Sequence, residues 1–306
     1  MKWHLLDNGS FSVGSFDWDA NLLLTSTPHD FLDTQTGDVV RFSAWEIDKD
    51  PTIMSSGRYE FPEWDMFQSF MHATDVCGFL DHRSFDGFID DTMYAVENNT
   101  FSPSFGVWKN EFLIKWRVFN ILTARWNAAD NLEKWVRLLN QELLSDEEKD
   151  IQIENIIRNY GLHWLSQEQI LNYYFKEICD YYPCSNTHFW KWISNENPYP
   201  DVRKARVMKE RIIPRTQWLV SERCKDADQI PPIAIGFSDD SVANVVAMWN
   251  MFMQDKQGQE FLSNNKARLY FSWWREDYNK IKDWIWKKWR FREVEKHGEE
   301  LLQVIL

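Results

Sequence analysis

The sequence predicts an α/β protein with three layers, in which helices cover a parallel sheet. Three short apolar segments, at residues 11–16, 116–122 and 233–237, have the length and composition of buried strands. Apolar residues at helical spacing follow two of these strands, at Leu132, Trp135, Val136, Leu139 and at Val242, Val245, Trp249, Phe252. Each strand also ends in polar side chains. Ligands bind at the carboxyl ends of strands in an open α/β sheet, so a site is expected there; the strand order stays open.

Two aspartates follow the first strand, at Asp17 and Asp19. Two carboxylates at the end of one strand do not sit stably side by side without a cation or a shared proton. Taken alone, the pair is weak evidence for a catalytic site, because a solvated acidic turn or the metal-binding pair of a glycosyltransferase has the same pattern. It gains weight from three segments that lie far away in the sequence.

The second strand ends at a hydroxyl, Thr123, which taken alone is most simply a helix N-cap. A lysine, Lys204, stands directly before the apolar residues of a predicted helix at 205–213. We favour Lys204 over Lys209 as an anion-binding residue, because Lys204 is nearer to the helix N-terminus. Lys209 remains a competitor for that role.

The third strand ends in a second pair of carboxylates, Asp239 and Asp240. Taken alone, such a pair is also what the macrodipole favours at the start of a helix. The combination of the four segments is more specific than any one of them.

The chain contains, in this order, FDWD, LTAR, a lysine and GFSDD, and this order resembles the haloacid dehalogenase (HAD) superfamily of aspartyl-phosphate phosphohydrolases. The resemblance covers roughly residues 11–30, 115–145 and 200–255 and implies a Rossmann-like core with inserted cap elements. It also implies roles for single residues. The nucleophile is Asp17, the general acid and base is Asp19, and the phosphate is held by Thr123, Ala124 and Lys204. The Mg²⁺ ligands are the carboxylates of Asp17, Asp239 and Asp240 and the backbone carbonyl oxygen of Asp19.

Three residues depart from the pattern of that superfamily. Asn21 stands where many relatives carry threonine or valine, and Ser241 and Asn244 stand where a further acidic residue is common. Asn244 has an amide that is able to orient a metal ligand or a water, but it carries no charge. These differences affect the expected coordination of the metal more than the expected class of reaction.

The function that this resemblance implies is Mg²⁺-dependent hydrolysis of a small phosphorylated substrate. Sugar phosphates, nucleotides and phosphoproteins all remain open as substrates. Two alternatives also remain, a phosphotransferase that uses the same residues and a binding or scaffold protein on the same fold with little turnover.

The expected core comprises residues 1–40, 115–145 and 200–306. Residues 41–114 are expected to form an inserted cap or lid, and residues 146–199 a second, mostly helical insertion. Capping boxes in the second insertion are indicated by Ser145 with Glu148 and by Ser166 with Gln169. Whether these segments gate the site is left open.

Composition narrows the class of partner and the compartment. The formal net charge of −13 disfavours binding to a nucleic acid backbone. No apolar run approaches the ~20 residues of a membrane span, and the first residues lack the apolar region of a signal peptide, so a cytoplasmic protein without a membrane partner is expected. The four cysteines show no metal-binding or disulfide spacing.

An aromatic segment at residues 273–289 is expected to form a helix near the C-terminus. Its apolar face is spaced at three or four residues and comprises Trp274, Tyr278, Ile281, Ile285 and Trp289. Packing against the core is the favoured role of this face, and an oligomer interface is the alternative.

Overall fold

The computed structural model describes residues 10–305, apart from residues 20, 25–27, 44–45, 47–49, 51, 61–91, 126–127, 185–199, 224–229, 273–289 and 297–298. The aromatic helix expected at 273–289, and any oligomer interface on it, lie outside the described residues. No helix in the described part of the chain is long and apolar enough to cross a membrane.

The centre of the protein is a sheet with the strand order β6-β5-β1-β7-β8-β10-β9 among the described residues. Five neighbouring strands run parallel, namely β6 (Asp180–Pro183), β5 (Val118–Thr123), β1 (Phe11–Phe16), β7 (Ile233–Ser238) and β8 (Arg268–Ser272). Two antiparallel strands extend this sheet, β10 (Glu299–Ile305) and β9 (Arg290–Lys296). The predicted α/β class with a parallel sheet is confirmed.

The three strands expected from the apolar runs form the middle of this sheet. The central strand β1 lies between β5 and β7, and all three are almost entirely buried, as parallel strands are. The chain leaves β1 toward β5 and β6 on one side and returns to β7 on the other. The sheet therefore reverses its direction of growth at β1, and that switch point is where α/β sheets bind ligands.

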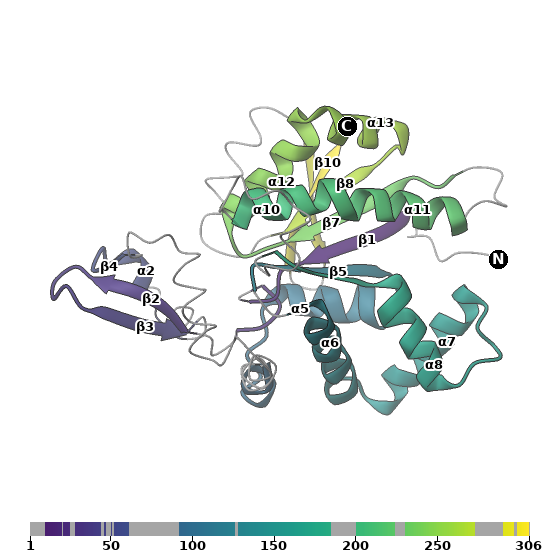
Figure 1. Ribbon diagram of the computed structural model, residues 1–306, viewed down its shortest axis with the longest axis horizontal. Helices are drawn as coiled ribbons and strands as arrows, with labels where there is room; N and C mark the ends of the chain where they lie inside the picture. The colour runs from purple at the N-terminus through teal and green to yellow at the C-terminus, as the bar shows by residue number, and fades with distance from the viewer. Residues whose placement is uncertain are drawn as a thin grey trace.

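Helices gather in two groups around the sheet (Figure 1). One group lies near β7 and β8 and comprises α10 (Pro200–Val207), α11 (Ile213–Arg223), α12 (Val242–Gln254) and α13 (Lys256–Asn264). The other lies near β5 and comprises α5 (Pro103–Val107), α6 (Ala129–Leu143), α7 (Asp146–Tyr160) and α8 (Gln167–Tyr173). Short π-helical segments continue three of these helices, at η1 (Trp108–Leu113), η2 (Tyr174–Ile178) and η3 (Met208–Ile212).

A second, smaller sheet is formed by β3 (Val39–Ser43), β2 (Pro28–Asp33) and β4 (Tyr59–Glu60), with the short helix α2 (Thr52–Ser55) beside it. Figure 1 shows it to one side, apart from the central sheet. It has a small apolar cluster of its own around Phe31 and Ile53. The boundary expected at residues 40 and 41 falls inside β3, because this sheet already begins at Pro28.

The end of the first expected insertion packs into the main core. The rings of Phe112 and Phe16 meet edge to face at 5.0 Å, and those of Trp108 and Phe119 at 5.8 Å. Residues 103–113 therefore belong with the central sheet, which differs from the expectation that the insertion runs to residue 114.

The second expected insertion also differs from the expectation in one respect. Both of its capping boxes are present, at the starts of α7 and α8, and residues 146–178 are mostly helical. It also contains β6, which pairs in parallel with β5 and adds an edge strand to the central sheet. Two tyrosines and a proline carry no clear strand pattern, and a proline is tolerated here because β6 is an edge strand.

Candidate functional site

The carboxyl ends of β1 and β7 bring the two acidic segments together. The register pairs Phe16 with Ser238, so the residues that follow, Asp17 and Asp239, leave the sheet at the same edge. The backbone N–H of Asp17 donates a hydrogen bond to the carbonyl oxygen of Ser238, at 3.0 Å. Residues that are 222 positions apart in the chain thus meet because their strands are neighbours in the sheet.

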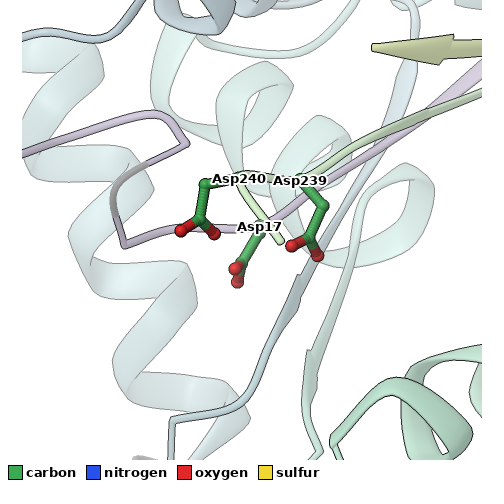
Figure 2. A group of neighbouring side chains, drawn as sticks. All are labelled: Asp17, Asp239 and Asp240. Carbon is green, nitrogen blue, oxygen red and sulfur yellow. The ribbon is translucent and has the colours of Figure 1, made fainter. Parts of the chain in front are cut away.

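The three aspartates whose carboxylates were predicted to bind a metal form one cluster. One carboxylate oxygen from each of Asp17, Asp239 and Asp240 lies within 4.8 Å of the others (Figure 2). Asp17 and Asp239 are buried, and Asp240 is half-buried. Within the described part of the chain, the Asp19 side chain is not a member of this cluster.

A buried cation, Lys204, joins two of these carboxylates. Its Nζ lies 2.9 Å from Oδ2 of Asp17 and 2.7 Å from Oδ2 of Asp239, and its side chain is 1% exposed. Helix α10, which carries Lys204, packs against α12, which follows Asp239 and Asp240. Two adjacent elements therefore deliver the ammonium and the carboxylates to the same place.

The competing lysine lies elsewhere. Nζ of Lys209 is 2.6 Å from Oδ2 of Asp255, the N-cap residue of α13. Lys209 belongs to the π-helical segment η3, which follows α10, and its side chain is partly exposed. The structure thus places Lys204, and not Lys209, beside Asp17. The reason given from the sequence was wrong, because α10 begins at Pro200 and Lys204 lies in its last turn rather than at its N-terminus.

Burial decides the charge states in this cluster. It raises the pKa of Asp17 to about 7, against the lowering effect of Lys204, and the nearby carboxylate of Asp239 adds to the rise. Burial raises the pKa of Asp239 as well. For Lys204 burial acts in the opposite direction, but the two carboxylates outweigh it and raise the pKa of the ammonium. The ammonium is therefore firmly charged.

The second predicted carboxylate of the first motif, Asp19, has a cation of its own. The Arg125 guanidinium donates from Nε to Oδ2 of Asp19 at 2.7 Å and from Nη2 to Oδ1 at 2.6 Å. Both residues are buried. No role for Arg125 followed from the sequence, although it stands directly after Thr123 and Ala124. The only feature of the sequence that pointed to Arg125 as a site residue is its position close to the predicted phosphate-binding hydroxyl of Thr123.

Thr123 and Ala124 lie at the end of β5. Thr123 is the last residue of the strand, is buried, and its Oγ1 accepts a hydrogen bond from the backbone N–H of Arg125 at 3.3 Å. Ala124 follows the strand and is half-buried. The N-cap of the following helix α6 is Ala128. The simpler interpretation of Thr123 as a helix cap is therefore wrong.

The residues that depart from the superfamily pattern contact the acidic cluster directly. The side-chain amide of Asn244 donates to Oδ1 of Asp239 at 2.8 Å, and the backbone N–H of Ser241 donates to the same oxygen at 2.9 Å. With Lys204 on its other oxygen, the Asp239 carboxylate is held on both sides. These contacts fix its orientation, as the amide of Asn244 suggested.

The third departure, Asn21, links the two strands at the edge of the sheet. Its amide nitrogen donates to the carbonyl oxygens of Asp17 at 3.2 Å and of Ser238 at 3.1 Å. Its amide oxygen accepts from the hydroxyls of Ser104 at 3.0 Å and Ser238 at 2.9 Å. A threonine or valine has no group that donates to both carbonyls at once, so Asn21 ties β1 to β7 just behind the carboxylates.

The donor set of the cluster fits a hard divalent cation. Mg²⁺ prefers oxygen ligands and is held in proteins by one or two carboxylates together with water and substrate phosphate. The carboxylates of Asp17 and Asp240 supply such oxygens beside Asp239, within the distance given above. The cluster brings three carboxyl groups together with one ammonium, so it holds more acidic groups than Lys204 balances. A bound cation would remove that imbalance.

Comparisons of this chain with protein-family models, with curated proteins and with solved structures found no match.

Proposed function

We propose that the protein is a Mg²⁺-dependent phosphomonoester hydrolase of the HAD type, with Asp17 as its nucleophile. The observation that carries this proposal is the buried ammonium of Lys204 between Asp17 and Asp239, with Asp240 beside them. These are residues from three distant segments for which the resemblance implies one shared site. A buried ion pair is weak evidence for stability, so a role in the chemistry of the site is the better account of this lysine.

In the first half of the proposed reaction, a carboxylate oxygen of Asp17 attacks the phosphorus atom of the substrate in line with the leaving group. The bond from phosphorus to the leaving oxygen breaks, and Asp19 gives its proton to that oxygen. In the second half, Asp19 takes a proton from a water molecule, whose oxygen attacks the phosphorus. The bond from phosphorus to Asp17 then breaks, which releases inorganic phosphate and restores both carboxyl groups.

The remaining residues bind the phosphate rather than react with it. The Lys204 ammonium, the Thr123 hydroxyl and the backbone N–H of Ala124 would contact its oxygens. Asp17 and Asp240 would hold the metal, and Asp239 would complete that side of the site in the orientation that Asn244 gives it. Mg²⁺, when bound, neutralises the phosphate and the carboxylates.

The experiment that tests this function is a screen for phosphate release from sugar phosphates, nucleotides and phosphopeptides, with Mg²⁺ or with a chelator. We expect turnover with Mg²⁺ that the chelator abolishes, and a loss of about 10³-fold or more in Asp17→Asn, whose amide is nearly isosteric but a poor nucleophile. The matched control is Asp255→Asn, which removes a carboxylate from the Lys209 pair away from the site.

Two results would count against the proposal. Asp17→Asn with most of the wild-type turnover would exclude Asp17 as the nucleophile, and an unchanged rate in the chelator would exclude the metal. Transfer to an acceptor other than water would use the same residues. Adding alcohols to the same assay and analysing the products separates the two reactions.

A further inference from the structure

Arg125, which pairs with Asp19, has no role in the reaction described above. Two parallel N–H groups of one guanidinium meet the two oxygens of one carboxylate, at 2.7 and 2.6 Å. The Arg125 side chain is 2% exposed and the Asp19 side chain 11% exposed. The two residues are 106 positions apart in the chain, so only the parallel pairing of β1 with β5 brings them together.

Stability alone does not explain such a pair. Removing two charges from water costs several kcal/mol per ion, and apolar residues of similar volume often serve the fold as well or better. The position of the pair suggests a different reason. Asp19 stands two residues after Asp17, and Arg125 stands two residues after Thr123, so the pair lies at the same sheet edge as the nucleophile.

The fork geometry has a specific consequence for the carboxylate. A guanidinium that donates to both oxygens fixes the plane of the carboxylate as well as its distance, which a single ammonium cannot do. A carboxylate has about four lone-pair sites, of which the two hydrogen bonds occupy two. Arg125 therefore determines the direction in which the remaining lone-pair sites of Asp19 point, and a proton on Asp19 lies in one of those directions.

We propose that Arg125 is a positioning residue that holds Asp19 in the orientation required for proton transfer to the leaving group. This inference rests on the proposed phosphohydrolase function of the same site. Arg125 acts through Asp19, and its removal lets the carboxylate rotate away from the leaving oxygen while Asp17, Lys204 and the phosphate site stay in place.

The dependence of rate on the leaving group tests this role. An alkoxide leaves poorly and needs the proton of Asp19, whereas 4-nitrophenolate leaves well and needs little protonation. The ratio kcat/KM reports the steps up to the transfer of phosphate to Asp17, so the later attack of water does not obscure the comparison. A loss of packing alone would lower kcat/KM for both substrates alike.

The experiment compares Arg125→Gln and Arg125→Lys with the wild type, using an alkyl phosphate and 4-nitrophenyl phosphate with Mg²⁺. In Arg125→Gln we expect kcat/KM to fall about 100-fold for the alkyl phosphate and less than about 10-fold for the aryl phosphate, at nearly unchanged KM. Arg125→Lys should recover part of the loss. Asp19→Asn should show the same selectivity, and adding Arg125→Gln to it should cause no further loss.

The control variant is Arg117→Gln, which breaks another largely buried pair, with Glu111 of η1. Its ratio between the two substrates should equal that of the wild type. If Arg125→Gln does not fold, the ratio measured for Arg125→Lys, which keeps the buried charge, decides the question.

Three outcomes would overturn the inference. An unchanged ratio between the substrates in the Arg125 variants would exclude a positioning role, and a raised KM with unchanged kcat would show that Arg125 binds the phosphate itself. In both cases the proposed phosphatase function would stand. Absence of wild-type turnover on both substrates and on every phosphate monoester of the broader screen would instead refute that function, and the positioning role with it.

Discussion

The lysine and carboxylates of the site stabilise one another only as a set. Asp17 and Asp239 share the ammonium of Lys204, and Asp239 also accepts hydrogen bonds from Asn244 and from the backbone of Ser241. A charge in such surroundings is costly to leave alone, because the interior screens it poorly. A charged side chain therefore contributes far more to the free energy of unfolding in this cluster than at the surface.

Two lysines of the same helical region provide a direct comparison. Lys204→Met should lower the free energy of unfolding by about 3–5 kcal/mol, because it leaves two buried carboxylates without their cation. Lys209→Met should cost no more than about 1 kcal/mol, because the Lys209 side chain is 31% exposed and its partner Asp255 35% exposed. Urea unfolding with a chelator at pH 8 measures both. Equal losses in the two variants would contradict the difference in burial.

Between elements, the contact of α12 with α13 depends on a glycine. A Cβ at Gly258 would lie 2.3 Å from the carbonyl oxygen of Met251 and 2.8 Å from Cα of Phe252. Both atoms belong to the backbone, so no rotation of a side chain relieves the contact. The two helices therefore approach each other closely only because residue 258 has no side chain.

This close approach yields a prediction with an internal control. Gly258→Ala should destabilise the protein by about 1–3 kcal/mol, as overpacking does. Gly106→Ala, in α5, should be neutral or stabilising by up to about 1 kcal/mol, because nothing lies within 4 Å of its Cβ position and alanine favours a helix. Thermal or urea unfolding of both variants measures the difference. A stable Gly258→Ala protein would show that α12 and α13 separate without cost.

At the scale of the whole molecule, the acidic cluster links stability to pH. The folded state raises the pKa of Asp17 from 3.8 to about 7, so folding favours the protonated form of this residue. Its contribution to stability is fully present below about pH 4 and is lost as the pH rises through about 7. The net charge of the whole chain is −13, so the rest of the protein does not stabilise the ionised form of these carboxylates.

We therefore expect Asp17→Asn to become more stable relative to the metal-free wild type as the pH rises from 5 to 8. The gain should be on the order of 2–4 kcal/mol, since one pKa unit corresponds to about 1.4 kcal/mol. The measurement is urea unfolding across this range in a chelator. Asp255→Asn is the matched control: Lys209 lowers the pKa of Asp255 below 3.8, so the contribution of Asp255 is lost only as the pH falls below about 4, and the difference between Asp255→Asn and wild type should not change from pH 5 to 8. A difference between Asp17→Asn and wild type that does not change with pH would contradict the raised pKa.

Local patterns were sufficient to predict several parts of this protein. The strands β1 and β7 are runs of apolar residues whose burial is visible in composition alone, and the capping boxes at Ser145 and Ser166 depend on residues only three positions apart. The meeting of Asp17 with Asp239 also followed, through the resemblance and the rule that parallel strands end at one edge. Each of these features depends on neighbouring residues or on a general rule of sheets.

The tertiary structure decided what depends on distant partners. The strand β6 is a strand because β5 offers its edge, and the boundary of the small sheet at Pro28 depends on pairing with β3 and β4. Arg125 meets its partner Asp19, which is 106 residues away, only in the folded chain. The sequence by itself therefore determined which residues are apolar, capped or acidic, since those properties are local. Which cation neutralises which carboxylate was determined only by folding, because the energy of a buried charge depends on what lies within a few ångströms of it.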